Sequence, residues 1–438
     1  MKNVPLIKLP FCTQEEFDNA VKTVEMCKVE RPVWGFMHPF FAPGGAYGEC
    51  WWSLDAALAV DGYKWIDYTC EEDIVNNLLE TMESDGRVKL YGIDGFGHIP
   101  SVKEQIASIP RFYDTCYTAA KRRNDKDFSQ KVYKLLSENL KWWFEKRQDK
   151  ETSLISAVFE ETFRPNIETV SMEYFPMDTN MQIVSGCFSA SALADVLNIP
   201  EKAKYFREKA KEILEAVNKY LWNEKKGAYY PYLKTENSHY DVLMASTFNG
   251  MLCGNAGKGR AEILVKKLLD NDFFGWDEHT VTSVARNDKD FAVVTGEYIG
   301  NPCWSGSVWT YFNKIIIKGL KDSGYYDIAS ELAYKTVVEF ADNYTEFHHP
   351  FDGSGHGVYD YAWTASQFIQ IIIEDVFGID YDAVSGTITV KPNVPVGFFG
   401  EMCSVEGLVL PDGNFLDVFV KDGKTEYKYN GSLKVVTE

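Results

Sequence analysis

Apolar residues recur at steps of three and four along much of the chain, which is the spacing of amphipathic helices. The clearest run covers residues 201–222, where Ala203, Phe206 and Ala210 alternate with Lys and Glu after Pro200 in the first turn. Similar runs predict further helices over residues 14–29, 53–60, 71–84, 102–122, 127–147, 180–197, 241–253, 258–270, 303–320, 324–341 and 361–375. The pattern therefore indicates a large body that is mainly α-helical.

Toward the C-terminus the pattern changes to an alternation of polar and apolar residues, which is typical of strands. The strands are predicted over residues 387–390, 407–410 and 416–420, with turns at 411–414 and 421–424. The sequence thus predicts two units, a helical catalytic domain over residues 1–380 and a small antiparallel β module over residues 381–438.

Many connectors between the predicted helices are long and carry aromatic and acidic side chains. They cover residues 34–52, 88–101, 160–178, 271–302 and 342–361. Loops that only join packed helices usually have about 2–8 residues, so connectors of this length suggest a functional face. No short internal repeat is visible, which disfavours a solenoid. We therefore expect an (α/α)6 barrel, a closed toroid of helical hairpins.

The composition fits a protein that binds a neutral polar ligand. Acidic residues outnumber basic ones by 64 to 45, which gives a formal net charge of −19. Nucleic acids and anionic membranes are disfavoured as partners because phosphate binding requires a basic surface. No apolar run approaches the ~20 residues that cross a bilayer. The oligomeric state is not indicated by any pattern.

The cysteines and the first residues favour a cytoplasmic location. The nine cysteines are an odd number, scattered without a CxxC pair, so reduced thiols are expected rather than disulfides or a zinc site. The opening residues have neither the apolar core nor the cleavage signal of a secretory leader. No cofactor or metal is expected.

The first segment with candidate chemistry runs from Trp34 to Asp55. It places Trp34, Trp51, Trp52 and Asp55 in and beside a Gly-rich loop that leads into a helix. Sugar rings expose apolar C–H faces that lie on Trp rings, while carboxylates accept hydrogen bonds from hydroxyl groups. A buried aromatic cluster with Asp55 at a helix start is the structural alternative.

The second segment contains Glu160 and Glu161 after an apolar run, and Asp178 before a predicted helix. A carboxyl group near apolar residues is a candidate for burial and a raised pKa. Asp178 would serve equally well as a helix cap. His98, in a Gly-His-Ile-Pro stretch, is a further candidate hydroxyl contact or a core histidine.

The last two segments combine small residues, aromatics and one carboxylate. The first holds Asn301, Trp304 and Trp309, and the second holds Glu346, His348, His356, Tyr361 and Trp363. Small residues between the two Trp let the backbone approach a ligand. The histidines lack the i, i+4 spacing of a helical zinc site, which disfavours a metal.

Four motifs resemble those of the (α/α)6 glycoside hydrolases of families 63 and 37, which include processing α-glucosidases, mannosylglycerate and glucosylglycerate hydrolases, and trehalases. The motifs are Pro176-Met-Asp178-Thr-Asn180, the hairpin end from Leu221 to Tyr230, Trp304-Ser-Gly-Ser-Val-Trp309, and Glu346-Phe-x-x-Pro350 followed by Tyr361-x-Trp363. The likeness covers roughly residues 40–380. In two places the chain departs from these families: Ser305 stands where they have Arg, and residues 159–164 lack their acidic Asp.

The resemblance implies hydrolysis of a short, neutral, α-linked glycoside with inversion. Glu346 matches the general base, and the general acid would be Glu161 or Glu160. In this scheme the two carboxyl groups stand ~6.5–9.5 Å apart so that a water fits between the base and the sugar. Asp55 and Asp178 would bind sugar hydroxyls. The pocket would be walled by Trp52, Trp304, Trp309 and Trp363.

Three alternatives remain open at this stage. A sugar epimerase or isomerase on the same toroid would use histidines as acid and base, for which His279, His348, His349 and His356 are available. A phosphorylase would replace the base by a phosphate pocket. A carbohydrate-binding protein that has lost its acid would keep the aromatic pocket without turnover.

Overall fold

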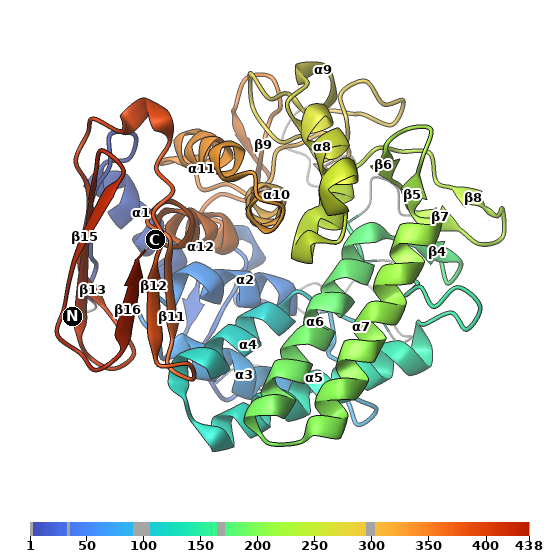
Figure 1. Cartoon of the computed structure of the whole chain (residues 1–438), viewed down its shortest axis with the longest axis horizontal. Helices are drawn as coiled ribbons and strands as arrows, with labels where there is room; N and C mark the ends of the chain where they lie inside the picture. Colours follow the sequence, from blue (N-terminus) through green and yellow to red (C-terminus); the bar gives the residue numbers. More distant parts are fainter. Residues whose placement is uncertain are drawn as a thin grey trace.

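Two concentric rings of helices form the body of the molecule (Figure 1). The computed structural model describes residues 3–32, 36–90, 106–158, 160–163, 171–294 and 303–437. Within these ranges the inner ring consists of α2 (Ser53–Tyr63), α4 (Phe112–Arg123), α6 (Met177–Val196), the 3-10 helix η4 (Ala245–Gly254), α10 (Thr310–Asp322) and α12 (Ala362–Gln370). Each contacts the next, and α12 contacts both α10 and α2, so the ring closes. The predicted (α/α)6 toroid is confirmed.

The outer ring covers the inner one and faces solvent. It consists of α1 (Gln14–Met26), α3 (Cys70–Thr81), α5 (Lys126–Lys146), α7 (Pro200–Tyr220), α8 (Gly257–Leu268) and α11 (Tyr326–Phe340), with the short α9 (Asn271–Phe274) after α8. The sequence explains this division. Helix α7 has one apolar stripe and buries only that face, whereas every residue of α2 is buried because the helix is apolar nearly all round.

Short strands in the connectors order the loops at one end of the rings. These pairs and triplets involve β2 (Lys28–Val29), β3 (Phe40–Phe41), β4 (Tyr174–Phe175), β5 (Trp222–Asn223), β6 (Ala228–Tyr229), β7 (Tyr232–Leu233), β8 (Ser238–His239), β9 (Phe347–His348) and β10 (Gly355–His356). The sequence did not predict them, because two-residue strands are too short to show a period.

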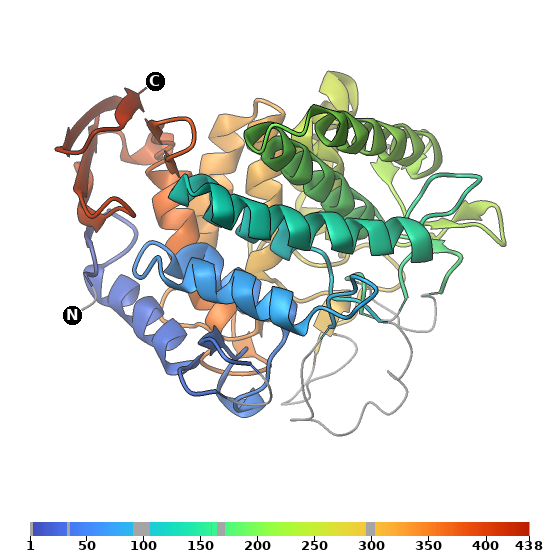
Figure 2. The ribbon, with the colours of Figure 1, turned by 90° about the horizontal axis from the view of Figure 1, so that it is seen from below.

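Two small sheets pack beside the helical body (Figures 1 and 2). The first has the strand order β1-β13-β14-β15 and is antiparallel, and the second has the order β11-β12-β16. Their strands are β1 (Leu6–Lys8), β11 (Ile379–Asp382), β12 (Thr387–Val390), β13 (Cys403–Val409), β14 (Phe415–Lys421), β15 (Lys424–Tyr429) and β16 (Lys434–Thr437). All pairs are antiparallel except β12 with β16, which is parallel. The predicted strands at 387–390, 407–410 and 416–420 correspond to β12, β13 and β14.

Strand β1 links the two ends of the sequence. Ile7 in β1 lies opposite Val405 in β13, and both side chains are buried. The helical unit predicted over residues 1–380 thus contributes a strand to a sheet of the unit predicted over residues 381–438. The π-helical turn η6 (Ile371–Val376) and β11 flank the predicted boundary.

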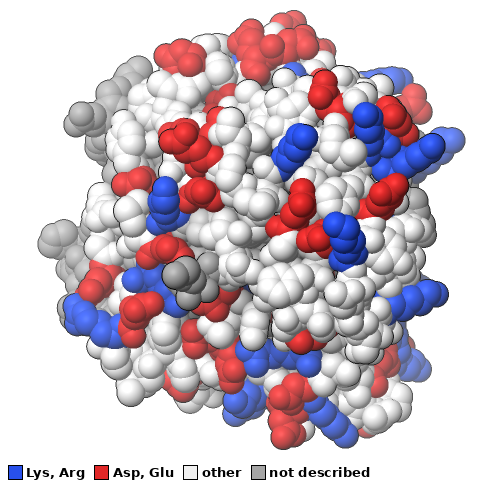
Figure 3. Space-filling model, turned by 90° about the vertical axis from the view of Figure 1, so that its left-hand side faces the viewer, with Lys and Arg blue, Asp and Glu red and all other residues white. Residues whose placement is uncertain are grey.

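Charged side chains of both signs are interspersed over the face that carries the sheets (Figure 3). Among the described residues, no helix is both long and apolar enough to cross a membrane. None of the nine cysteines, all of which lie in the described ranges, forms a disulfide, and all except Cys253 are buried. Helix α4 begins at Phe112, ten residues after the predicted start at residue 102, and residues 91–105 lie outside the described ranges.

Helices α2 and α12 approach each other closely at Gly62. Its amide donates to Oγ of Ser366 (2.9 Å), and this hydroxyl also contacts the carbonyl oxygens of Leu58 and Ala59. A Cβ at residue 62 would lie 1.8 Å from the carbonyl oxygen of Ser366. Only glycine therefore allows the inner ring to close at this point.

Gly62→Ala should lower the free energy of unfolding by at least about 1–3 kcal/mol, because the added methyl group meets backbone that cannot move aside. Gly259→Ala in α8 is the matched control, since a Cβ there meets no atom within 4 Å. That control should be neutral or stabilising by up to about 1 kcal/mol. Urea denaturation of both variants measures the difference, and equal stabilities would contradict the close approach.

Candidate active site

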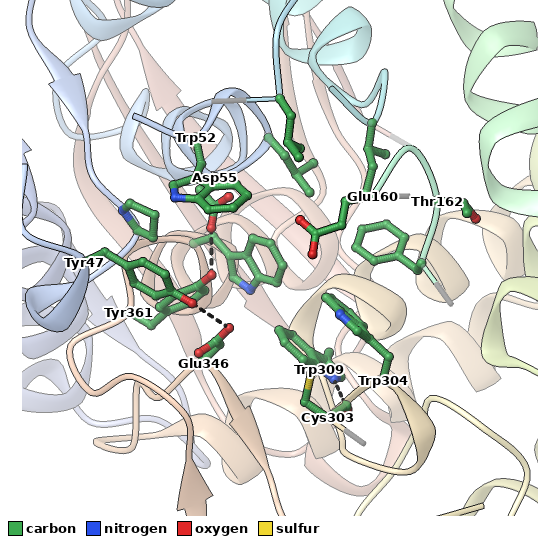
Figure 4. A pocket seen from close by; sticks show the side chains of 16 residues that line it. Tyr47, Trp52, Asp55, Glu160, Thr162, Cys303, Trp304, Trp309, Glu346 and Tyr361 are labelled. Carbon is green, nitrogen blue, oxygen red and sulfur yellow. Dashed lines mark hydrogen bonds between the residues drawn. The ribbon is translucent and has the colours of Figure 1, made fainter. Parts of the chain in front are cut away.

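A cavity of about 370 Å³ lies where several inner helices begin (Figure 4). The first turns of α2 and α12 and the residue before α10 contribute Asp55, Trp363 and Trp309 to its wall. The described lining residues are Pro43, Tyr47, Trp52, Leu54, Asp55, Leu90, Ile109, Glu160, Thr162, Phe163, Cys303, Trp304, Trp309, Glu346, Tyr361 and Trp363. Long loops and helix N-termini thus converge on one aromatic and acidic pocket.

Glu346 lies on the wall, immediately before β9, and is almost fully buried. Its Oε1 accepts a hydrogen bond from the Tyr47 hydroxyl (3.3 Å), and its Oε2 accepts one from the Val358 amide (3.2 Å). Burial raises the pKa of Glu346 to about 7, with smaller contributions from the charges of Asp55 and Glu160 that the two hydrogen bonds oppose. The carboxyl group therefore titrates near neutral pH.

Asp55 occupies the first turn of α2 and is also buried. Its Oδ1 accepts a hydrogen bond from the Tyr361 hydroxyl (2.7 Å). Burial raises the pKa of Asp55 to about 7, and the Glu160 charge acts in the same direction. Since the charges of Glu160 affect both Asp55 and Glu346, the three carboxyl groups form one electrostatic cluster within the cavity.

Glu160 comes from the loop between α5 and α6, and its carboxyl group projects into the cavity opposite Glu346 (Figure 4). Its neighbour Glu161 turns away from the cavity and is wholly buried. The Glu161 carboxylate forms a bidentate ion pair with Arg147 (2.8 Å for both contacts) and accepts the amides of Ala107 and Val158. These hydrogen bonds from Arg147, Ala107 and Val158 hold Glu161 in place, and they thereby fix the loop that presents Glu160.

Asp178 holds the same loop from the first turn of α6. It accepts hydrogen bonds from the Thr162 hydroxyl (2.7 Å) and the Phe163 amide (2.8 Å), and burial raises its pKa to about 6. It does not line the cavity, so its contacts are with the loop rather than with the open space. Glu161 and Asp178 together anchor the loop on both sides of residue 162.

Aromatic rings form the other walls. The rings of Trp304 and Trp309 stack 3.8 Å apart at an angle of 8°, and Trp363 lies 5.6 Å from Trp309. Phe163 packs on Trp304 at 4.8 Å. Among the described residues, the buried Nε1 of Trp363 finds no hydrogen-bond partner.

The structure brings together most of the residues expected from the sequence. Glu346, Glu160, Trp52, Asp55, Trp304, Trp309, Tyr361 and Trp363 line the cavity. Five other expected residues do not line the cavity: Glu161, Trp51, Asp178, His348 and His356. Trp51 stacks on Phe36 at 4.5 Å, and His356, in the strand β10 that pairs with β9, contacts Ser354. Trp34, His98 and Asn301 lie outside the described residues.

Several lining residues were not predicted. Tyr47, Thr162 and Phe163 stand within segments that the sequence already marked as functional, so their position was a usable signal. Leu90 and Ile109 carried no signal of their own, because single apolar residues in a connector or a predicted helix look like ordinary core. Within the described ranges, no three His, Cys, Asp or Glu side chains are grouped as a metal site requires.

Comparisons with known proteins match this chain to sugar-cleaving enzymes. Residues 49–364 match the model of the mannosylglycerate hydrolase MGH1-like glycoside hydrolase domain. A mannosylglycerate hydrolase from Rubrobacter radiotolerans is 26% identical over 192 residues, 43% of this chain and 42% of that protein. The chain therefore spans less than half the length of this relative.

Solved structures share the fold at low identity. The family 63 mannosylglycerate hydrolase from Thermus thermophilus, crystallised with glucose, has a TM-score of 0.65 at 16% identity, covering 81% of this chain and 99% of that one. The family 78 rhamnosidase from a Bacillus species has a TM-score of 0.72 at 15% identity, covering 99% of this chain and 42% of that one.

Glu346→Gln should stabilise the folded protein at alkaline pH. Burial raises the pKa of Glu346 from 4.5 to about 7, so its contribution to stability is full below pH 4.5 and is lost as the pH rises to 7. The variant should exceed the wild type by up to about 3 kcal/mol at pH 8, and the difference should shrink toward pH 4.5. Thermal denaturation across this range measures it, and a constant difference would contradict the burial effect.

Proposed function

Because the chain belongs to the family of MGH1-like glycoside hydrolase domains, we propose that it hydrolyses a short, neutral, α-linked glycoside with inversion at the anomeric carbon. The observation that carries the proposal is the pair Glu346 and Glu160, two carboxyl groups that line the same aromatic cavity from opposite sides (Figure 4). Glycosidic cleavage needs one group to protonate the leaving oxygen and another to activate water, and two carboxyl groups suffice.

Glu346 is the proposed general base. In its ionised form it accepts the Tyr47 hydroxyl and the Val358 amide, which leaves lone pairs free to take a proton from water. A pKa of about 7 makes the carboxylate a stronger base than an exposed glutamate while keeping a large ionised fraction at neutral pH. As the water attacks the anomeric carbon, the proton passes to Glu346.

Glu160 is the proposed general acid. It belongs to the same loop as Thr162 and Phe163, and its carboxyl group enters the cavity across from the proposed base (Figure 4). Its proton passes to the glycosidic oxygen as the C–O bond breaks. The contacts of Glu161 and Asp178 keep this loop in place, so these two residues support the acid without reaching the substrate.

The remaining polar groups fit the binding of a sugar ring. Asp55 lines the cavity and can accept hydrogen bonds from sugar hydroxyl groups. The faces of Trp52 and the Trp304–Trp309 stack offer flat surfaces for the C–H faces of a pyranose. The cavity thus combines sparse polar groups that fix orientation with apolar surface that excludes water.

A histidine-based epimerase is less well supported. Within the described part of the chain no histidine lines the cavity. His279 and His348 contact Glu339 instead, and His349 contacts Asp352 (3.1 Å). Histidines held in this way are not presented to a sugar in the cavity.

Incubation with a panel of α-disaccharides and glycosylglycerates, followed by NMR that resolves the two anomers, tests the proposal. We expect release of a free sugar that appears first as the β-anomer, and a kcat for Glu346→Gln about 10²–10⁴-fold below the wild type. Glu331→Gln, an exposed glutamate on α11, is the control and should leave the rate unchanged. Binding by calorimetry without any hydrolysis would indicate a carbohydrate-binding protein, and an α-anomer would contradict inversion.

Glu160→Gln should show a loss of rate that depends on the leaving group. Hydrolysis of a disaccharide should fall by about 10²–10⁴-fold, because an alkoxide leaves poorly without a proton. A glycosyl fluoride or an activated aryl glycoside needs little protonation, so its rate should fall much less. Kinetics on both substrate types measure the ratio, and equal losses would assign Glu160 a role other than acid.

A further inference from the structure

A carboxylate on the outer ring holds two histidines together near the catalytic wall. Glu339, close to the C-terminal end of α11, contacts Nδ1 of His279 through Oε2 (2.5 Å) and Nδ1 of His348 through Oε1 (3.0 Å). His279 belongs to the connector after α9, and His348 to β9. We call these three residues the Glu339 clamp. It joins the connector after α9 to the end of α11 and to β9.

His348 is the central member and has no exposed surface. Its Nε2 donates to the carbonyl oxygen of Asn343 (2.9 Å), since a carbonyl oxygen can only accept. The contact of Nδ1 with the Glu339 carboxyl group then requires one more proton, carried either by the ring or by the carboxyl group. Phe340 stacks on the ring at 4.0 Å and completes the enclosure. The ring is thus fixed in orientation at both nitrogens.

The backbone of His348 connects the clamp to the cavity. Its amide donates to the carbonyl oxygen of Val308, and the Val308 amide donates to its carbonyl oxygen, both at 2.9 Å. Val308 immediately precedes Trp309, and Glu346 stands two residues before His348 on the same short segment. Any shift of His348 along this bridge would therefore move both the proposed base and a cavity wall.

We propose that Glu339 and His348 are positioning residues for Glu346: the clamp fixes β9 and thereby the carboxylate that activates water. This inference rests on the proposed hydrolytic function for its catalytic consequence. Neither residue lines the cavity, so both act through the strand and not on the substrate. The described sugar-facing residues Trp52, Asp55 and Trp363 belong to α2, its N-terminal flank and α12, and do not depend on the clamp for their contacts.

The test compares Glu339→Ala with Glu339→Gln. The alanine variant removes the bridging group, and kcat should fall about 10- to 100-fold because a displacement near 1 Å misaligns the base. KM should change much less than kcat, since the contacts of Trp52, Asp55 and Trp363 remain. In Glu339→Gln the amide NH₂ can donate to Nδ1 of a neutral His348 while its oxygen accepts from His279, so most of kcat should return.

Glu80→Ala is the matched control. Glu80 makes a similar contact with a histidine, His38 (3.0 Å), but lies on α3, none of whose residues lines the cavity. Its kcat and KM should equal those of the wild type. Loss of kcat in all three variants in proportion to a lowered melting temperature would indicate a structural role and overturn the proposal.

Hydrogen exchange measured by mass spectrometry tests the clamp without any substrate. In Glu339→Ala the amides of Glu346, His348 and Val308 should exchange faster than in the wild type, whereas those of α2 should not change. Unchanged exchange at these amides overturns the inference. If the wild type is active, an unchanged kcat of Glu339→Ala overturns it as well. If the wild type cleaves none of the glycosides, the proposed function fails, and the exchange result still decides whether the clamp fixes the strand.

Discussion

Burial disfavours the ionised form of a carboxyl group unless a cation lies beside it, and this constraint governs how the two ends of the barrel differ. At the cavity end, Glu346 and Asp55 meet neutral donors such as Tyr47 and Tyr361, and their pKa values rise to about 7. Protonation near neutral pH is therefore the main way in which this cluster relieves its charge. Carboxyl groups with a pKa near 7 can both take up and release protons at neutral pH, which suits a site that moves protons.

The opposite ends of the same inner helices follow the reverse logic. Burial acts to raise the pKa of Glu374, but the adjacent cations of Lys64 and Lys314 lower it to about 2. Asp375 likewise accepts from Lys314 (2.6 Å) and Lys321 (2.7 Å). These carboxylates remain charged, and their ion pairs join η6 to α10 and to the end of α2. One barrel thus uses acidic residues in two ways, and the presence or absence of adjacent cations decides which.

The sequence allowed prediction of those features that depend on local patterns of residues. Three- and four-residue spacing marked most of the helices, and Glu346 was chosen as a candidate because the motif around it is long and distinctive. The choice between Glu160 and Glu161 could not be read from the sequence, since adjacent residues in a loop point in different directions and only the position of Arg147 separates them. His348 was misplaced for a similar reason: a histidine beside functional residues can face a carboxylate behind the wall as easily as the cavity itself.

Strand β1 has a consequence for how the chain is made. Its partner, β13, is not synthesised until the helical rings have left the ribosome, so the nascent protein carries Ile7 and its neighbours with an unpaired edge for most of translation. Pairing that spans nearly the whole sequence closes slowly compared with local helical contacts. The β1–β13 pair can therefore form only after the residues between the two strands have been made, and until then the edge of β1 that β13 covers stays unpaired.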